Sequence, residues 1–192
     1  MVQRQKFLRK ELTMAKLRGK EPRPQDKRLK AMIFGEAGVG KTTACLQMPK
    51  PYIIDCERGT DNYSAQVEAV DGLVFHTVDS EELLNEVRTL RTQKHDHLTR
   101  CIDSITTVYS DLLDKCEAKV GTEFGRHYGL ANKTMRMFMN LIMSLDMNVI
   151  ITAHCKPIYG NNLAVLGTTF DGWKNMDYIF DLVLELKRAT ST

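Results

Sequence analysis

Residues 35–42 read Gly-Glu-Ala-Gly-Val-Gly-Lys-Thr, which matches the phosphate-binding pattern G-x-x-x-x-G-K-[ST]. Glycines let the backbone approach phosphate oxygens closely, and successive amides present partial positive charge to the anion. In this pattern Lys41 reaches the β- and γ-phosphates, and the hydroxyl of Thr42 is placed to hold Mg²⁺. The stretch therefore predicts a site for a nucleoside triphosphate. The predicted nucleotide-binding residues are Gly35, Glu36, Ala37, Gly38, Val39, Gly40, Lys41, Thr42 and Thr43.

The sequence on both sides of this loop fits the strand–loop–helix arrangement that the motif requires, which argues against a mere glycine-rich turn with a surface lysine. Residues 31–34 form an apolar run typical of a buried parallel strand, and a helix can begin at Thr42. Similar runs alternate with helical stretches, which predicts an α/β fold with a mostly parallel sheet and helices on both faces. The predicted strands are 31–34, 51–55, 73–78, 98–103, 149–153 and 178–186, and the predicted helices are 42–48, 61–70, 81–90, 108–116 and 130–147.

Composition narrows the class of protein. The chain has 192 residues, of which 43% are hydrophobic and 27% charged, as is usual for a soluble globular domain. No window approaches 18 uninterrupted apolar residues, so we expect a cytoplasmic protein without a membrane partner. The five cysteines are odd in number and form no C-x-x-C pair, which argues against a disulfide framework and a zinc site.

The charge of the chain is divided unevenly. Residues 1–30 contain eleven Lys or Arg against three acidic residues, whereas the remainder holds sixteen basic and twenty-one acidic residues. We therefore expect a basic N-terminal arm at 1–28 and a mildly acidic core domain at 29–192. The arm is suited to contact with nucleic acid, with an acidic surface or with a neighbouring subunit. A solvated tail has the same composition, so both interpretations stay open.

An ATPase needs a carboxylate at a strand end to hold Mg²⁺ and a second group to activate water. Asp103 ends a predicted strand about sixty residues beyond the phosphate-binding loop and is favoured for the metal, with Asp55 as its competitor. Glu57, two residues after Asp55, is placed to act as general base. His154 follows the predicted strand 149–153, at the sheet edge where ligands of open α/β folds bind. It is suited to contact the γ-phosphate, although a histidine that only satisfies the loop backbone is the alternative.

Four motifs together resemble the RecA-like core of recombination ATPases: residues 35–42, Ile-Asp-Cys-Glu at 54–57, Ile-Asp-Ser at 102–104 and Thr-Ala-His at 152–154. With the Tyr-Gly pair at 128–129, the resemblance is closest to phage-type nucleotide-binding proteins associated with single-strand annealing. It covers about residues 29–188. It implies that Glu57 is the catalytic glutamate, Asp103 the Mg²⁺-side aspartate and His154 the γ-phosphate sensor, with Lys41 acting on the phosphates.

The resemblance also implies partners. It predicts homo-oligomers, in rings or filaments, that hydrolyse ATP slowly, bind single-stranded DNA and promote annealing or recombination, with a single-strand-binding protein as a further partner. The segments 120–127 and 155–172 correspond to the DNA-facing loops, yet both are only weakly basic. The DNA-binding candidates are Arg126, Lys156, Tyr159 and Lys174, and the candidates for completing a neighbour's ATP site are Lys174, Lys187 and Arg188.

Three other functions compete with this one. A regulatory GTPase is disfavoured because Asp103 is not followed by the glycine of D-x-x-G and Asn132-Lys133 lacks the guanine-reading aspartate. A small-molecule kinase usually needs an arginine-rich lid, and no arginine-dense loop follows the core. ATP-dependent assembly without DNA uses the same nucleotide site, and the sequence leaves it open.

Overall fold

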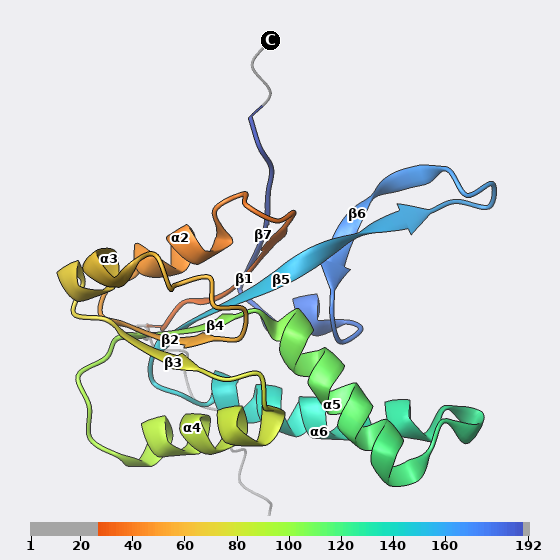
Figure 1. Ribbon diagram of the computed structural model, residues 1–192, viewed down its shortest axis with the longest axis horizontal. Coiled ribbons are helices and arrows are strands. Elements are labelled where there is room, and N and C mark those ends of the chain that lie inside the picture. The colour runs from red at the N-terminus through yellow and green to blue at the C-terminus, as the bar shows by residue number, and fades with distance from the viewer. Residues whose placement is uncertain (1–26, 190–192) are drawn as a thin grey trace, which may run out of the picture.

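A computed structural model describes residues 27–189 of the protein, so the predicted arm lies almost entirely outside the described residues. Its centre is a seven-stranded sheet (Figure 1). Six strands follow the order β3-β2-β4-β5-β1-β7 and pair in parallel, and β6 pairs antiparallel with β5. The strands are β1 (Lys30–Gly35), β2 (Pro51–Asp55), β3 (Leu73–His76), β4 (Thr99–Asp103), β5 (Asn148–Tyr159), β6 (Val165–Asp171) and β7 (Leu182–Leu186).

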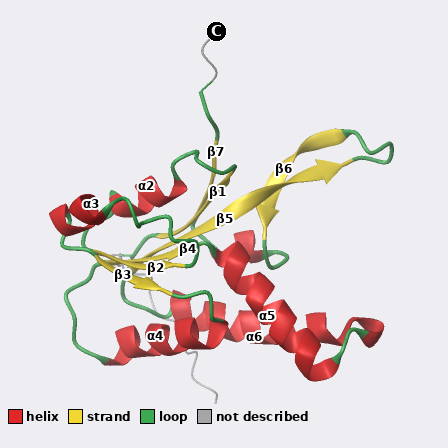
Figure 2. Cartoon of the chain, in the orientation of Figure 1, coloured by secondary structure: helices red, strands yellow, loops and turns green. Residues whose placement is uncertain are grey.

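Helices cover both faces of the sheet, as Figure 2 shows. The short helices α2 (Lys41–Leu46) and α3 (Ser64–Ala69) lie on one face. The longer helices α4 (Ser80–Thr92), α5 (Ile105–Val120) and α6 (Arg126–Met143) lie on the other. This arrangement confirms the predicted α/β fold with a mostly parallel sheet.

Alternation along the strands divides the core between the two faces. In β1, Ala31 and Ile33 pack with Cys45 of α2, whereas Met32 and Phe34 pack with residues of α4, α5 and α6. The two sets alternate because successive side chains of a strand point to opposite faces. Both sets are buried because helices cover each face of the sheet. A strand buried on both faces reads as a continuous apolar run, which is why this element was predictable.

Two methionines of α6 contribute to the core. Met135 and Met139 are fully buried against the sheet, while Met137 on the opposite side of the helix is 63% exposed. Four of the five cysteines, Cys45, Cys56, Cys101 and Cys116, are likewise buried as free thiols.

Two predicted loops are wrong, because both carry regular structure. Helix α6 begins at Arg126 rather than near 130, and a short 3₁₀ helix η1 (Glu123–Gly125) precedes it. The predicted loop 155–172 is mostly a β-hairpin, since β5 continues to Tyr159 and then pairs with β6. This hairpin projects beyond the sheet in Figure 1, so its side chains lack the burial pattern that identifies a strand.

The end of the described chain also differs from the prediction. The single strand predicted at 178–186 is divided into a 3₁₀ helix η2 (Met176–Ile179) and the strand β7, which pairs with β1 at the edge of the sheet. Within residues 27–189, none of the helices combines the length and the apolar character that crossing a membrane requires.

Candidate functional site

The phosphate-binding loop joins β1 to α2, and its glycines are required by its geometry. A Cβ atom on Gly35 would lie 2.5 Å from the backbone oxygen of Leu186, so β7 leaves no room for a side chain there. Gly38 and Gly40 have φ angles of 72° and 103°, which L-residues with side chains rarely adopt. The loop is therefore shaped by its own sequence and by the edge strand beside it.

A cavity of about 570 Å³ lies over this loop. Among the predicted nucleotide-binding residues, all except Val39 line it; Val39 lines a smaller neighbouring cavity. Glu57, Asp103 and His154 line the same cavity, so the structure brings the predicted catalytic residues together with the loop. The volume lies in the range typical of small-molecule sites.

Three residues that line the cavity were not predicted: Gly59, Tyr63 and Cys155. Gly59 and Tyr63 follow Glu57 in the segment after β2, and Cys155 follows His154 on β5. Their positions in the sequence, close to predicted site residues, could have indicated that they line the cavity. No local pattern indicates which neighbours of a catalytic residue turn toward its cavity.

Lys41 is held at the start of α2 by the loop itself. Its Nζ atom donates hydrogen bonds to the carbonyl oxygens of Gly35 at 3.0 Å and Glu36 at 2.8 Å. The residue is only 8% exposed. An ammonium group fixed over a ring of backbone groups is suited to bind phosphate oxygens.

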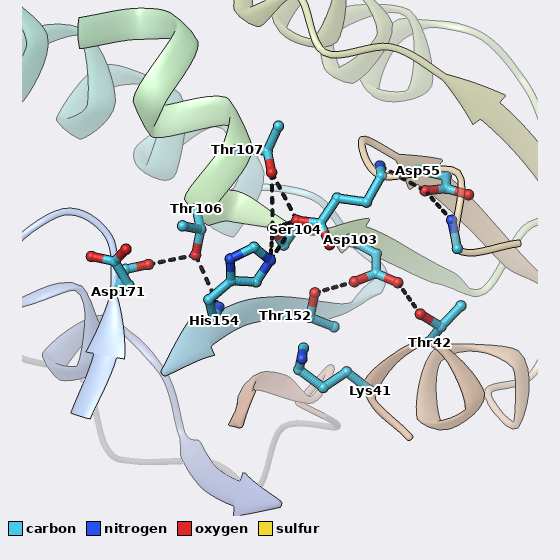
Figure 3. Close-up of polar contacts among 12 residues, drawn as sticks. Lys41, Thr42, Asp55, Asp103, Ser104, Thr106, Thr107, Thr152, His154 and Asp171 are labelled. Atoms are coloured by element: carbon cyan, nitrogen blue, oxygen red, sulfur yellow. Dashed lines mark hydrogen bonds and ion pairs between the residues drawn. The ribbon is translucent and has the colours of Figure 1, made fainter. Parts of the chain in front are cut away.

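Asp103, the predicted metal-side carboxylate, lies beside Thr42. The Thr42 hydroxyl donates to Asp103 Oδ2 at 2.6 Å, and Thr152 donates to the other carboxylate oxygen (Figure 3). Burial raises the pKa of Asp103 above its ordinary value, the two hydroxyls oppose this, and the charges of Glu57 and Asp55 add to it. A nearby cation would reverse the shift, because it stabilises the ionised carboxylate.

The oxygen ligands around Thr42 fit Mg²⁺, which prefers hard oxygen donors and takes few of them from the protein. Thr42 and Asp103 would hold the ion, which when bound would polarise phosphate oxygens. The space beside them depends on Gly59. A Cβ atom there would lie 3.0 Å from Thr42 Oγ1 and 3.7 Å from Asp103 Oδ2, filling the position next to both ligands.

Asp55, the alternative candidate for binding the metal, has different hydrogen-bond partners from Asp103. Its side chain is buried and accepts backbone hydrogen bonds from Glu57 at 3.0 Å, Gly59 at 3.2 Å and Thr60 at 2.8 Å. The Thr60 hydroxyl donates a further bond at 2.5 Å. Burial opposes ionisation, but these hydrogen bonds outweigh it and hold the pKa of Asp55 below its ordinary value. Asp55 therefore organises the segment that carries Glu57.

Glu57 is bound on one oxygen only. Its Oε1 atom accepts hydrogen bonds from the hydroxyls of Ser104 and Thr107, the latter at 2.7 Å, and lies 2.6 Å from His154 Nε2. Burial raises the pKa of Glu57, but these hydroxyls and His154 outweigh burial and hold it below the ordinary value. Among residues 27–189, Oε2 has no hydrogen-bond partner. Glu57 is thus ionised at neutral pH with one oxygen free to accept a proton.

The predicted DNA-binding residues are spread over several elements. Arg126 begins α6, Lys156 and Tyr159 lie on β5, and Lys174 precedes η2. The start of α6 and the tip of the β5–β6 hairpin are well separated in Figure 1. Lys156 Nζ forms an ion pair with Asp171 at 3.0 Å, which offsets its charge, whereas Tyr159 is 59% exposed.

Two of the three residues predicted to complete a neighbour's site, Arg188 and Lys187, contact their own chain. Arg188 donates to the Ala37 carbonyl oxygen of the phosphate-binding loop at 3.2 Å. Lys187 pairs with Glu185 at 3.0 Å. Their predicted action on a neighbouring subunit stays a prediction.

A model of the AAA domain family matches residues 27–192 of the chain. The matched region includes the phosphate-binding loop, the Thr42–Asp103 pair and Glu57. Among curated proteins, none matches the chain. The family match and the geometry of the cavity agree on a nucleotide site built on a parallel sheet. The chain therefore belongs to the AAA domain family and carries a P-loop ATPase core.

Proposed function

We propose that the protein hydrolyses ATP with Mg²⁺ in the cavity over the phosphate-binding loop. One observation carries this proposal: Glu57, whose Oε2 has no hydrogen-bond partner among residues 27–189, lies in the same cavity as Lys41 and the Thr42–Asp103 pair. Phosphoryl transfer to water needs these parts, namely a phosphate cradle, a metal-side carboxylate and a group that orients the nucleophile.

Each residue has a distinct part in this reaction. Lys41 and the loop amides bind the phosphates, and Thr42 with Asp103 holds the ion. Glu57 orients water through Oε2 and accepts its proton. Tyr63 supplies an aromatic wall that can stack on a nucleotide base. His154, at the end of the buried part of β5, lies beside Glu57 and is placed to sense the γ-phosphate.

The direct test is phosphate release from ATP by the full chain, with Mg²⁺ and with EDTA. Wild type is compared with Lys41→Ala and with Glu68→Gln, an exposed carboxylate of α3 outside the cavity. Magnesium-dependent release that Lys41→Ala abolishes and Glu68→Gln retains supports ATP hydrolysis in this cavity. Release that survives Lys41→Ala at the wild-type rate would contradict it.

We further propose that this ATPase acts on single-stranded DNA as a homo-oligomer and promotes annealing or recombination. Its support is the resemblance to RecA-like annealing proteins, the basic residues 1–30, and Tyr159 exposed on the projecting hairpin, where an aromatic ring can stack on a base.

Fluorescence anisotropy of labelled single-stranded DNA tests this part, with and without a non-hydrolysable ATP analogue and across a salt series. The proposal predicts binding that the analogue strengthens in wild type but not in Lys41→Ala. The slope of affinity against salt estimates the number of phosphate contacts. Absence of binding at low salt, with nucleotide binding intact, would overturn it.

ATP-dependent assembly without DNA is the second candidate, and the ion pair between Lys156 and Asp171 favours it. Nucleic-acid affinity rests on cations available to phosphates, and this lysine is already paired within its own hairpin. Analytical ultracentrifugation with and without the ATP analogue separates the two. Oligomers that form with the nucleotide analogue and do not bind DNA would support ATP-dependent assembly without DNA binding.

A further inference from the structure

Thr106 joins the catalytic cavity to the β5–β6 hairpin without lining the cavity itself. It lies in the first turn of α5, directly after β4. Its hydroxyl accepts a hydrogen bond from the backbone N–H of His154 at 2.9 Å and donates one to the backbone carbonyl of Asp171 at 2.5 Å. Figure 3 shows both contacts on one oxygen atom.

These two backbone groups lie where the hairpin begins. His154 on β5 is opposite Asp171 on β6, and this is the first pair of the antiparallel ladder. Opposite residues in such ladders alternate between pairs that exchange N–H···O=C bonds and pairs that do not. The Thr106 hydroxyl binds one group from each strand, which only a side chain that both donates and accepts can do.

The same histidine contacts the catalytic carboxylate. The ring of His154 lies 2.6 Å from Glu57 Oε1, so its backbone is fixed by Thr106 while its side chain is beside the proposed general base. The next residue of α5, Thr107, binds Glu57 directly at 2.7 Å. Thr106 thus binds the backbone of the hairpin, whereas Thr107, the next residue of the same helical turn, binds the proposed general base Glu57.

Resting on the proposed ATP hydrolysis, we propose that Thr106 is a positioning residue that sets His154 against Glu57 and anchors the base of the β5–β6 hairpin to α5. Removing its hydroxyl leaves the cavity lining unchanged but releases the backbone of His154. The consequence is a loss of catalytic rate, with nucleotide affinity retained, together with a looser hairpin.

The test compares Thr106→Val, which keeps the shape and loses the hydroxyl, with Thr106→Ser, which keeps the hydroxyl. Thr134→Val is the matched control, since among residues 27–189 the hydroxyl of this half-buried helical threonine bonds only to a carbonyl oxygen of its own helix. Two quantities are measured: kcat and KM for ATP hydrolysis, and hydrogen exchange of the peptides covering 153–160 and 165–172.

We expect Thr106→Val to lower kcat about tenfold with KM within about twofold, because small misplacements of catalytic groups have effects of this order or larger. Exchange in both hairpin peptides rises. Thr106→Ser and Thr134→Val stay within about twofold of wild type in kcat, and their hairpin exchange is unchanged.

Wild-type kcat in Thr106→Val, or equal losses in the valine and serine variants, would overturn the positioning role. If wild type itself hydrolyses no ATP, the proposed function fails, and hydrogen exchange then decides the anchoring role alone. Unchanged exchange in Thr106→Val overturns it, and raised exchange that serine prevents upholds it.

Discussion

The ends of β2 and β4 carry the same chemical group in opposite surroundings. Asp55 and Asp103 are opposite each other in the pairing of these two strands, and both are buried. Asp55 meets three backbone amides and a hydroxyl, and its pKa is lowered. Asp103 meets two hydroxyls and two neighbouring carboxylates, and its pKa is raised.

This difference shows how one residue type takes two roles at adjacent strand ends. The charge of Asp55 is satisfied within the protein, so this aspartate stabilises the segment that presents Glu57. The charge of Asp103 is poorly satisfied, so it is suited to a cation that arrives with the nucleotide.

The largest expected effect lies on the segment that Asp55 organises. Glu57→Gln keeps the shape of the side chain but removes its ability to accept a proton. We expect kcat for ATP hydrolysis to fall about 10²–10⁴-fold, the usual contribution of a general base, with nucleotide affinity within about twofold. Single-turnover assays with Glu68→Gln as control measure this. A loss below about threefold would remove Glu57 from the chemistry.

The next effect concerns the space between the two strand ends. Gly59→Ala places a methyl group 3.0 Å from Thr42 Oγ1. Crowding of this kind typically costs 1–3 kcal/mol, so we expect roughly tenfold weaker ATP binding in Mg²⁺. In EDTA the variant should bind like wild type. Gly129→Ala is the control, because a Cβ atom there would lie within 4 Å of no other part of the described chain beyond its own helix backbone and neighbouring residues. An equal loss with and without Mg²⁺ would contradict the proposed position of the ion.

Stability should respond in opposite directions at the two aspartates. Asp55→Asn turns an amide N–H toward donors that need an acceptor, which we expect to lower the free energy of unfolding by about 2 kcal/mol. Asp103→Asn removes an uncompensated charge and should raise the melting temperature in EDTA by a few degrees, equivalent to about 1 kcal/mol. Urea and thermal unfolding without nucleotide measure both. Destabilisation by Asp103→Asn as large as that by Asp55→Asn would contradict the opposite roles assigned to the two aspartates.

The smallest effect is the pH dependence of stability. Since the pKa of Asp55 is lower when folded than its unfolded value near 3.8, its stabilisation is complete above that value and is lost as pH falls through the folded pKa. From about pH 5 to pH 2, wild type should lose more unfolding free energy than Asp55→Asn. The raised pKa of Asp103 acts oppositely, because acidification through it favours the folded state. Urea titrations at each pH measure how the unfolding free energy of each protein changes with pH.

Much of the sheet was predictable because its signals are local. The phosphate-binding loop is a contiguous pattern, and β1 and β2 are mainly apolar runs buried on both faces. Asp103 and Glu57 follow from their positions at strand ends. The roles of Asp55, Thr106 and Thr107 depend on contacts between segments far apart in the chain, so composition and spacing could not assign them.

The β5–β6 hairpin was not predicted, for a different reason. Its strands are exposed, so their side chains lack a buried face that repeats every second residue. The Gly160-Asn161-Asn162 stretch between them is a turn signal that could have indicated two paired strands. Helix α6 likewise begins in a polar segment, and its first turn, in which His127 is buried, has no apolar periodicity.

The most direct measurement is isothermal titration of ATP into wild type, Asp103→Asn and Asp55→Asn, each in Mg²⁺ and in EDTA, below the melting temperature of every variant. We predict that Mg²⁺ strengthens binding to wild type and to Asp55→Asn, whereas the difference between Mg²⁺ and EDTA disappears in Asp103→Asn. Loss of the magnesium effect in Asp55→Asn, with retention in Asp103→Asn, would contradict it.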